Sequence, residues 1–180
     1  MAEFGKFADR LLVFEGGFVN DKDDKGGATK YGVTLQTWIA NGHDKNGDGK
    51  INVEDIKLLT PEDAKMIAKK IYWDYFKADQ IHNQTIAEII VDWGWGSGRT
   101  TIAKKIQTML GLKADGLVGT STLERINSIP REVFFNHLKQ ARLEFVKKIV
   151  ERDSTQKKFY NGWVNRIQKF FFKEGDNENP

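Results

Sequence analysis

The chain of 180 residues contains no cysteine. This absence excludes thiol nucleophiles, disulfide bonds and zinc sites built from thiolates. Histidine is also scarce, because only His43, His82 and His137 are present and they are far apart in the sequence. Their spacing does not match the HExxH pattern, which places two zinc ligands on one face of a helix. The sequence therefore argues against a zinc-dependent amidase or peptidase.

A long apolar segment is the second feature that the sequence lacks. No apolar run approaches the roughly 18 residues that a membrane-spanning helix needs. The opening stretch MAEFGKFADRLLVFEGG carries acidic side chains early and has no small-residue cleavage site, unlike a signal peptide. We therefore expect synthesis in the cytoplasm without a signal peptide and no membrane-embedded part. A function outside the membrane would require release or export by another route.

Basic residues are only slightly in excess over acidic residues. The chain has 28 basic and 25 acidic residues, a formal net charge of +3 and a pI near 8.9. A basic excess favours polyanionic partners such as a cell envelope or a nucleic acid. The lysines and arginines of KQARLEFVKKIVER are mixed with Glu144 and Glu151, however, which is typical of a solvated helix face. We therefore expect no nucleic-acid partner, and we expect a monomer.

Helical patterns dominate the sequence. Apolar residues recur at helical spacing from Glu3 to Phe14, and a glycine pair would end that helix. The stretch that begins at Thr60 combines a capping residue, a proline and two acidic residues, which predicts a helix as far as Lys77. Further helices are expected at 34–40, 84–93, 99–110, 120–127, 130–152 and 156–172, with a glycine-rich break at 94–98. Residues 18–34 lack this period and favour a loop or small β hairpin.

The segment DKNGDGKINVED, residues 44–55, matches the spacing of an EF-hand-type calcium loop. The expected ligands are Asp44, Asn46 and Asp48 at the first, third and fifth positions, the Lys50 carbonyl at the seventh and Asp55 at the twelfth. Aspartate replaces the usual glutamate at the twelfth position, so a modest affinity is expected. A structural Ca²⁺ ion is favoured over a regulatory switch, because the chain has one such loop. The alternative is an Asx-rich turn that needs no metal.

Glu15 stands at the predicted end of the first helix, beside Phe14 and Phe18. The helix dipole and an apolar environment both disfavour the charged carboxylate, which suits a general acid. The aspartates of the following turn could supply a second carboxylate. Two carboxyl groups in unlike environments are the usual equipment for glycoside hydrolysis.

The segment EGGFVNDKDDKGGATKYGVT, residues 15–34, resembles the opening motif of the glycoside hydrolase family 108 muramidases. Three further segments also resemble parts of that family. They are DWGWGSG at 92–98, KKIQTMLGLKADGLVGTSTLERIN at 104–127 in its predicted peptidoglycan-binding half, and FYNGWVNRI at 159–167. Relatives include phage endolysin-like enzymes, and some are labelled secretion activator proteins.

The resemblance implies a mainly α, lysozyme-like fold: a helical bundle with a small β hairpin beside the active site. It implies hydrolysis of the β-1,4 bond between N-acetylmuramic acid and N-acetylglucosamine in peptidoglycan, without a catalytic cofactor. Glu15 would be the catalytic acid. Asp24 matches the spacing of the second catalytic residue in phage-type lysozymes, and Thr29 matches the residue thought to hold water, with Tyr31 as an alternative contact.

Trp93 and Trp95 could form a sugar-stacking wall, although aromatic residues at a helix break are also typical of a core.

We expect three parts in the chain: a lysozyme-like catalytic part at 1–95 that includes the loop at 44–55, a helical peptidoglycan-binding part at 96–173, and a disordered tail at 174–180. Two alternatives to the muramidase remain at this stage. One is a non-catalytic protein that binds the envelope or assists export, and the other is a cell-wall peptidase or amidase.

Overall fold

The computed structural model describes residues 1–14, 17–20 and 27–174, without the side chains of residues 12–14. The chain divides into two compact units. One unit is Gly5–Ile71, and the other combines Met1–Phe4 with the chain from Tyr72 onward. The expected tail lies outside the described residues from position 175.

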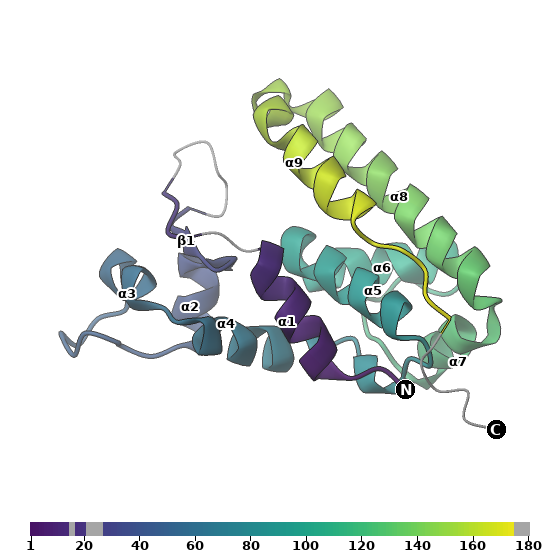
Figure 1. Cartoon of the computed structure of the whole chain (residues 1–180), viewed down its shortest axis with the longest axis horizontal. Helices are drawn as coiled ribbons and strands as arrows, with labels where there is room; N and C mark the ends of the chain where they lie inside the picture. The colour runs from purple at the N-terminus through teal and green to yellow at the C-terminus, as the bar shows by residue number, and fades with distance from the viewer. Residues whose placement is uncertain (15–16, 21–26, 175–180) are drawn as a thin grey trace. The chain divides into compact units, whose positions relative to one another are not determined.

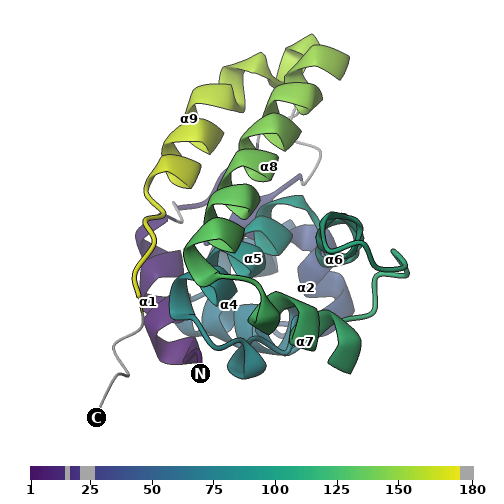
Figure 2. The same cartoon turned by 90° about the vertical axis from the view of Figure 1, so that its right-hand side faces the viewer.

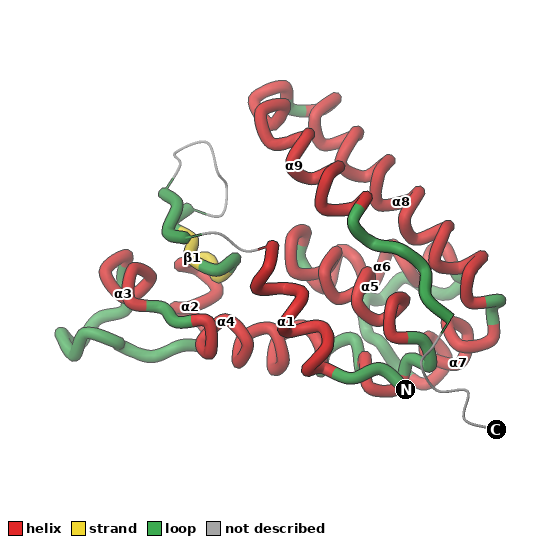
Figure 3. Tube along the Cα trace, viewed as in Figure 1, coloured by secondary structure: helices red, strands yellow, loops and turns green. Residues whose placement is uncertain are grey.

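The unit of residues 5–71 contains short helices and a small hairpin (Figures 1 and 3). Its elements are most of α1 (Phe4–Phe14), then β1 (Thr29–Lys30), β2 (Val33–Thr34), α2 (Leu35–Asn41), α3 (Val53–Leu58) and α4 (Pro61–Ile67). The strands are antiparallel, with Thr29 opposite Thr34 and Lys30 opposite Val33. Tyr31 and Gly32 form the connection with φ of 49° and 75°, as hairpin turns of two residues require.

A side-chain cap begins α4 where the sequence predicts it. The Thr60 hydroxyl accepts a hydrogen bond from the Asp63 backbone N–H, and the Asp63 carboxylate accepts one from the Thr60 N–H, a reciprocal capping box. The α-helix is shorter than predicted, however. It ends at Ile67 and continues as a π-helical segment, Ala68–Trp73, rather than as α-helix to Lys77.

The second unit is built around one buried helix (Figures 1 and 2). Its helices are η2 (Ala78–Gln80), α5 (Gln84–Ser97), α6 (Arg99–Met109), α7 (Thr120–Ser128), α8 (Arg131–Arg152), η3 (Ser154–Gln156) and α9 (Lys157–Gln168). Every residue of α5 from Thr85 to Trp95 is buried. The α5 helix packs against α6 and α8, and α9 lies alongside α8, as both views show.

The predicted break at 94–98 is wrong, because α5 continues through it to Ser97. Gly94 serves close packing there, since a Cβ atom on it would lie 2.4 Å from the ring of Phe76. The α5 helix ends at Ser97, and its C-cap residue, Gly98, has a φ of 85°. A glycine that looks like a helix breaker in the sequence thus makes room for a neighbouring ring.

The last helix is also shorter than predicted and ends at Gln168 instead of position 172. Phe170 is fully buried, and the chain then returns to the start of α5. There the Asn83 side chain donates a hydrogen bond to the Lys173 carbonyl at 2.8 Å while its oxygen caps α5. The chain near its N-terminus meets the same place, because the Ala2 N–H donates to the Ile81 carbonyl at 3.0 Å.

The structure confirms a mainly α fold with a two-stranded antiparallel hairpin (Figure 3). Within the described ranges, the chain has no helix of the length and apolar character needed to cross a bilayer.

Candidate functional site

The two carboxylates predicted for catalysis, Glu15 and Asp24, lie outside the described residues. Thr29 is described, and its backbone pairs with Val19 through two hydrogen bonds of 2.8 Å. The Thr29 hydroxyl donates to the Gly27 carbonyl at 3.0 Å. Because a hydroxyl oxygen also has two acceptor lone pairs, this bond orients the group and leaves it able to accept from a water molecule.

Tyr31 follows on the turn of the hairpin and keeps part of its side chain exposed. A φ of 49° is uncommon for a residue other than glycine, asparagine or aspartate. The turn therefore fixes Tyr31 two positions from Thr29, at the tip of the hairpin. The Lys30 ammonium lies 5.4 Å from the centroid of its ring.

Trp93 and Trp95 lie on α5, in the other unit, and both are buried. Trp93 is 1% exposed and its ring meets Phe145 edge-on, with ring centroids 5.8 Å apart. Trp95 is 9% exposed and packs against Tyr72, with centroids 5.0 Å apart. Both side chains therefore act as packing residues in this arrangement, which is the alternative that the sequence leaves open.

The loop at 44–55 is closed by hydrogen bonds from its own backbone. The Asp44 carboxylate accepts from the N–H groups of Gly47 and Gly49, each at 2.7 Å. Asn46 accepts from Asp48 N–H at 3.0 Å. Gly47 and Gly49 have φ of 78° and 82°, so glycine is needed where the chain turns.

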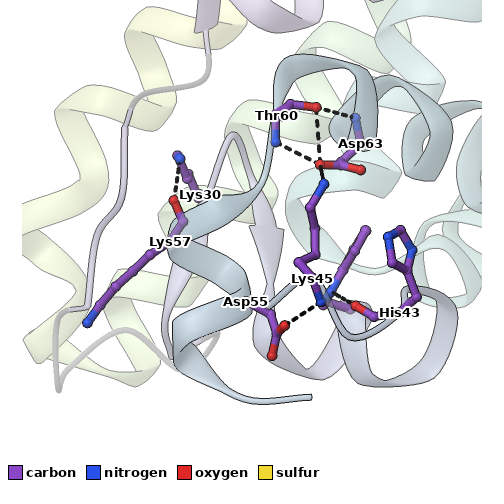
Figure 4. Close-up of polar contacts among 8 residues, drawn as sticks. Lys30, His43, Lys45, Asp55, Lys57, Thr60 and Asp63 are labelled. Carbon is purple, nitrogen blue, oxygen red and sulfur yellow. Dashed lines mark hydrogen bonds and ion pairs between the residues drawn. The ribbon is translucent and has the colours of Figure 1, made fainter. Parts of the chain in front are cut away.

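Asp55 closes this loop from its far end. Its carboxylate is buried and accepts from the Lys45 N–H at 2.6 Å (Figure 4). It also accepts from the Asn52 N–H at 2.7 Å. These backbone hydrogen bonds lower the pKa of Asp55. Lys45 also reaches α4, because its ammonium lies 2.6 Å from the Asp63 carboxylate (Figure 4). The loop is thus fastened to the helices on either side of residue 60.

The oxygen donors of the loop are of the kind that calcium prefers. Their present directions do not form a finished site, since the part of the chain that the structure describes has no cluster of three acidic or histidine side chains able to hold a metal ion. Asp55 in particular is directed at two backbone N–H groups. Calcium binding would therefore require these carboxylates to turn toward a common centre.

A buried ion cluster joins three helices of the second unit. Asp92 on α5 is 1% exposed and accepts from Arg142 of α8 and from Arg166 of α9, each at 2.6 Å. Burial alone would raise the pKa of Asp92, but attraction to Arg166 and Arg142 outweighs burial and lowers the pKa to about 2. Arg166 thereby ties the last helix to α5.

The DGLVG motif shapes a loop between α6 and α7. The buried side chain of Gln107 donates to the Asp115 carboxylate at 2.8 Å and accepts from the Gly116 N–H at 2.8 Å. Gly116 has a φ of 84°, and a Cβ atom on it would lie 3.0 Å from the Thr100 methyl group. These contacts give the motif a structural role in the connection between the two helices.

These features define a helical protein with a short hairpin that carries Thr29 and Tyr31. Comparison with known families assigns the class more closely. The sequence model described as Glycosyl hydrolase 108 matches residues 8–98, and the one described as Predicted Peptidoglycan domain matches residues 102–168. The chain therefore belongs to glycosyl hydrolase family 108, and it carries a predicted peptidoglycan domain after the family's own region.

Among solved structures, the fold is similar to that of SagA of Brucella abortus. The two chains are 28% identical, the match covers 93% of this chain and 90% of that chain, and the TM-score is 0.78. The name SagA agrees with the expectation that some relatives are labelled secretion activators. A comparison with proteins of curated function gives no match. Family and domain together support a glycoside hydrolase with a function related to peptidoglycan.

Proposed function

We propose that the protein is an N-acetylmuramidase that hydrolyses the β-1,4 bond between N-acetylmuramic acid and N-acetylglucosamine. The observation that carries the proposal is the family match over residues 8–98, which includes Glu15 within its characteristic motif. The predicted peptidoglycan domain at 102–168 supports the same polymer as substrate. Residues 1–95 would then supply catalysis and residues 96–173 would bind the wall.

In the proposed mechanism Glu15 protonates the leaving oxygen of the glycosidic bond. Asp24, with Thr29 or Tyr31, positions a water molecule or stabilises the oxocarbenium-like transition state. A carboxyl separation of about 6.5–9.5 Å would lead to inversion of the anomeric centre, and one of about 5 Å to retention. Of the aromatic residues proposed to contact sugar, Tyr31 has the best support, because Trp93 and Trp95 are buried.

Digestion of purified peptidoglycan sacculi distinguishes this proposal from its alternatives. The muramidase is expected to release new reducing ends that belong to N-acetylmuramic acid, without new free amino groups. Release of amino groups without reducing ends would instead identify a peptidase or amidase. We propose that the protein acts as a monomer on the wall after release or export.

A non-catalytic role in envelope binding or export is the second candidate. The similarity to SagA over 93% of this chain supports this candidate function. Under this alternative, the purified protein would sediment with sacculi and release neither reducing ends nor amino groups. The same digestion therefore tests both candidates.

We also propose that the loop at 44–55 binds one structural Ca²⁺ ion through Asp44, Asn46, Asp48, the Lys50 carbonyl and Asp55. A calcium excess of about 100-fold over Kd would stabilise the folded protein by about 2.7 kcal/mol. We expect EGTA to lower the Tm and added calcium to restore it.

Asp48→Asn keeps the oxygen that accepts from the Lys50 N–H but removes the charge. This variant should show a smaller calcium-dependent rise in Tm, and its Tm in EGTA should match the unmodified protein. A Tm that is the same in calcium and in EGTA would rule out the ion.

A further inference from the structure

Two lysines from different elements meet beside the hairpin. Lys30 lies on β1, and its ammonium donates to the backbone carbonyl of Lys57 at 2.5 Å (Figure 4). That carbonyl belongs to the last turn of α3, where unpaired carbonyl groups give the helix end a partial negative charge. The contact therefore holds the Lys30 ammonium in place. An ammonium group has three N–H donors, so this bond leaves capacity for a ligand.

The side chain of Lys57 extends this positive region toward an aromatic ring. Its ammonium forms an exposed ion pair with Glu54 at 2.7 Å and lies 5.9 Å from the centroid of the Phe18 ring. On the other side, the Lys30 ammonium lies 5.4 Å from the ring of Tyr31. Each of the two amines thus lies near an aromatic ring, and the hydrogen bond from Lys30 to the Lys57 carbonyl links the two residues.

Apolar side chains border these groups and are open to solvent. Phe18 is 38% exposed, Val19 is 50% exposed and Leu58 is 48% exposed. Single exposed apolar residues are common and need no explanation. Here two of them adjoin Lys57, because the Phe18 ring lies 5.9 Å from the Lys57 ammonium and Leu58 follows Lys57 in the chain. We call this surface the hairpin face, and its members are Phe18, Val19, Lys30, Tyr31, Lys57 and Leu58.

The hairpin face is continuous with the segment proposed for catalysis. Val19 pairs with Thr29 through two backbone hydrogen bonds, and Thr29 precedes Lys30 directly. A ligand on this face would therefore contact the strand that carries Thr29. Peptidoglycan fits the chemistry, because its sugars have apolar ring faces and its muramic acid units carry peptides with free carboxylates. Carboxylates pair with ammonium groups, and sugar rings pack on aromatic side chains.

We propose that Lys30 and Lys57 bind carboxylates of the peptide attached to the muramic acid, while Phe18 packs against a neighbouring sugar ring. This inference rests on the proposed muramidase activity and adds to it a preference for peptide-bearing glycan. Both lysines act in binding the substrate rather than in the bond-breaking step. Their removal should therefore change KM and leave kcat on peptide-free glycan unaltered.

The test uses soluble glycan strands in two forms: with their peptides, and after an amidase has removed the peptides. The unmodified protein should show the higher kcat/KM on the peptide-bearing form. In the double variant Lys30→Gln and Lys57→Gln, we expect a loss of about tenfold in kcat/KM on that form, in line with charge-assisted hydrogen bonds. The loss should appear in KM, and activity on the peptide-free form should stay the same.

Two control variants separate binding from structure. Lys30→Arg keeps the charge and the donor to the Lys57 carbonyl, so it should retain most of the preference. Lys70→Gln removes an exposed lysine of the same unit that the proposal does not use, and it should have no effect. The preference of the unmodified protein should also fall as salt is raised, because added ions screen exposed charges.

The outcomes distinguish this inference from the function on which it rests. Hydrolysis of both substrate forms at equal kcat/KM by the unmodified protein would overturn the role of the lysines and leave the muramidase intact. An equal loss of kcat/KM by the double variant on both forms, together with a lower Tm, would also overturn the role of the lysines. It would instead assign Lys30 a structural role. If neither form is cleaved, the proposed muramidase fails. The binding of the two glycan forms is then measured directly to test the role of the lysines. If the double variant binds the peptide-bearing form as tightly as the unmodified protein does, the proposed role of the lysines is overturned.

Discussion

Glu15→Gln is expected to reduce the release of reducing ends from sacculi by about 10²- to 10⁴-fold, the usual contribution of a positioned acid or base. Glutamine has nearly the same size as glutamic acid but cannot give a proton to the leaving oxygen. The loss should appear in kcat with little change in the binding of sacculi. It is measured by reducing-sugar assay and by sedimentation with the polymer.

A matched control is available for this variant in the same unit. Glu62→Gln makes the same chemical change at an exposed position in the first turn of α4. It should retain full activity, and both variants should keep the circular dichroism spectrum of the unmodified protein. Full activity of a folded Glu15→Gln protein would remove Glu15 from the mechanism and return Asp24 to consideration as the acid.

Asp92→Asn is expected to lower the free energy of unfolding by about 3–5 kcal/mol, the range for breaking a buried ion pair. The change would leave the guanidinium of Arg142, which is 5% exposed, without its carboxylate partner. In a protein of this size such a loss corresponds to a decrease in Tm of roughly 6–20 °C. Thermal unfolding followed by circular dichroism measures it.

The control for Asp92 is an exposed aspartate in an ion pair. The Asp9 side chain is 82% exposed and lies 3.6 Å from the Lys65 ammonium. Such surface pairs contribute about 0–1 kcal/mol, so Asp9→Asn should scarcely change the Tm. Similar Tm values for the two variants would show that the buried cluster does not hold α5, α8 and α9 together.

The same cluster makes stability depend on pH in a defined direction. The pKa of Asp92 is lowered from 3.8 to about 2, so its contribution is complete above pH 4 and is lost as the pH falls toward 2. A shift of this size is worth about 2 kcal/mol. The Asp92→Asn variant should therefore lose less stability across this interval than the unmodified protein does.

Local signals in the sequence predicted much of this fold. Thr60 and Asp63 form the capping box that their residue types indicate, because capping depends on residues close together in the chain. The small hairpin that residues 18–34 favour is present at Thr29–Thr34, where Gly32 has the positive φ of a turn residue. The motif that includes Glu15 indicated the family, and the family match agrees.

Other features depend on partners distant in the sequence. Gly94 looks like a helix breaker until the Phe76 ring is placed against it. The residues after Gln168 fit a helical period, but they lie outside the helix. The Lys173 carbonyl accepts a hydrogen bond from the Asn83 side chain instead. The burial of Trp93 and the pairing of Asp92 with residues 50 and 74 positions away likewise arise only from tertiary packing.

The bonds around the start of α5 also impose an order of events during synthesis on a ribosome. The Glu3 N–H donates to the side chain of Gln84, a residue made 81 positions later. The Asn83 side chain can form its hydrogen bond only after Lys173 has been synthesised, 90 positions after Asn83. Domains generally fold as units during translation, beginning with the N-terminal one. Residues 5–71 can therefore complete their unit while the nascent chain still lacks the segments that enclose α5.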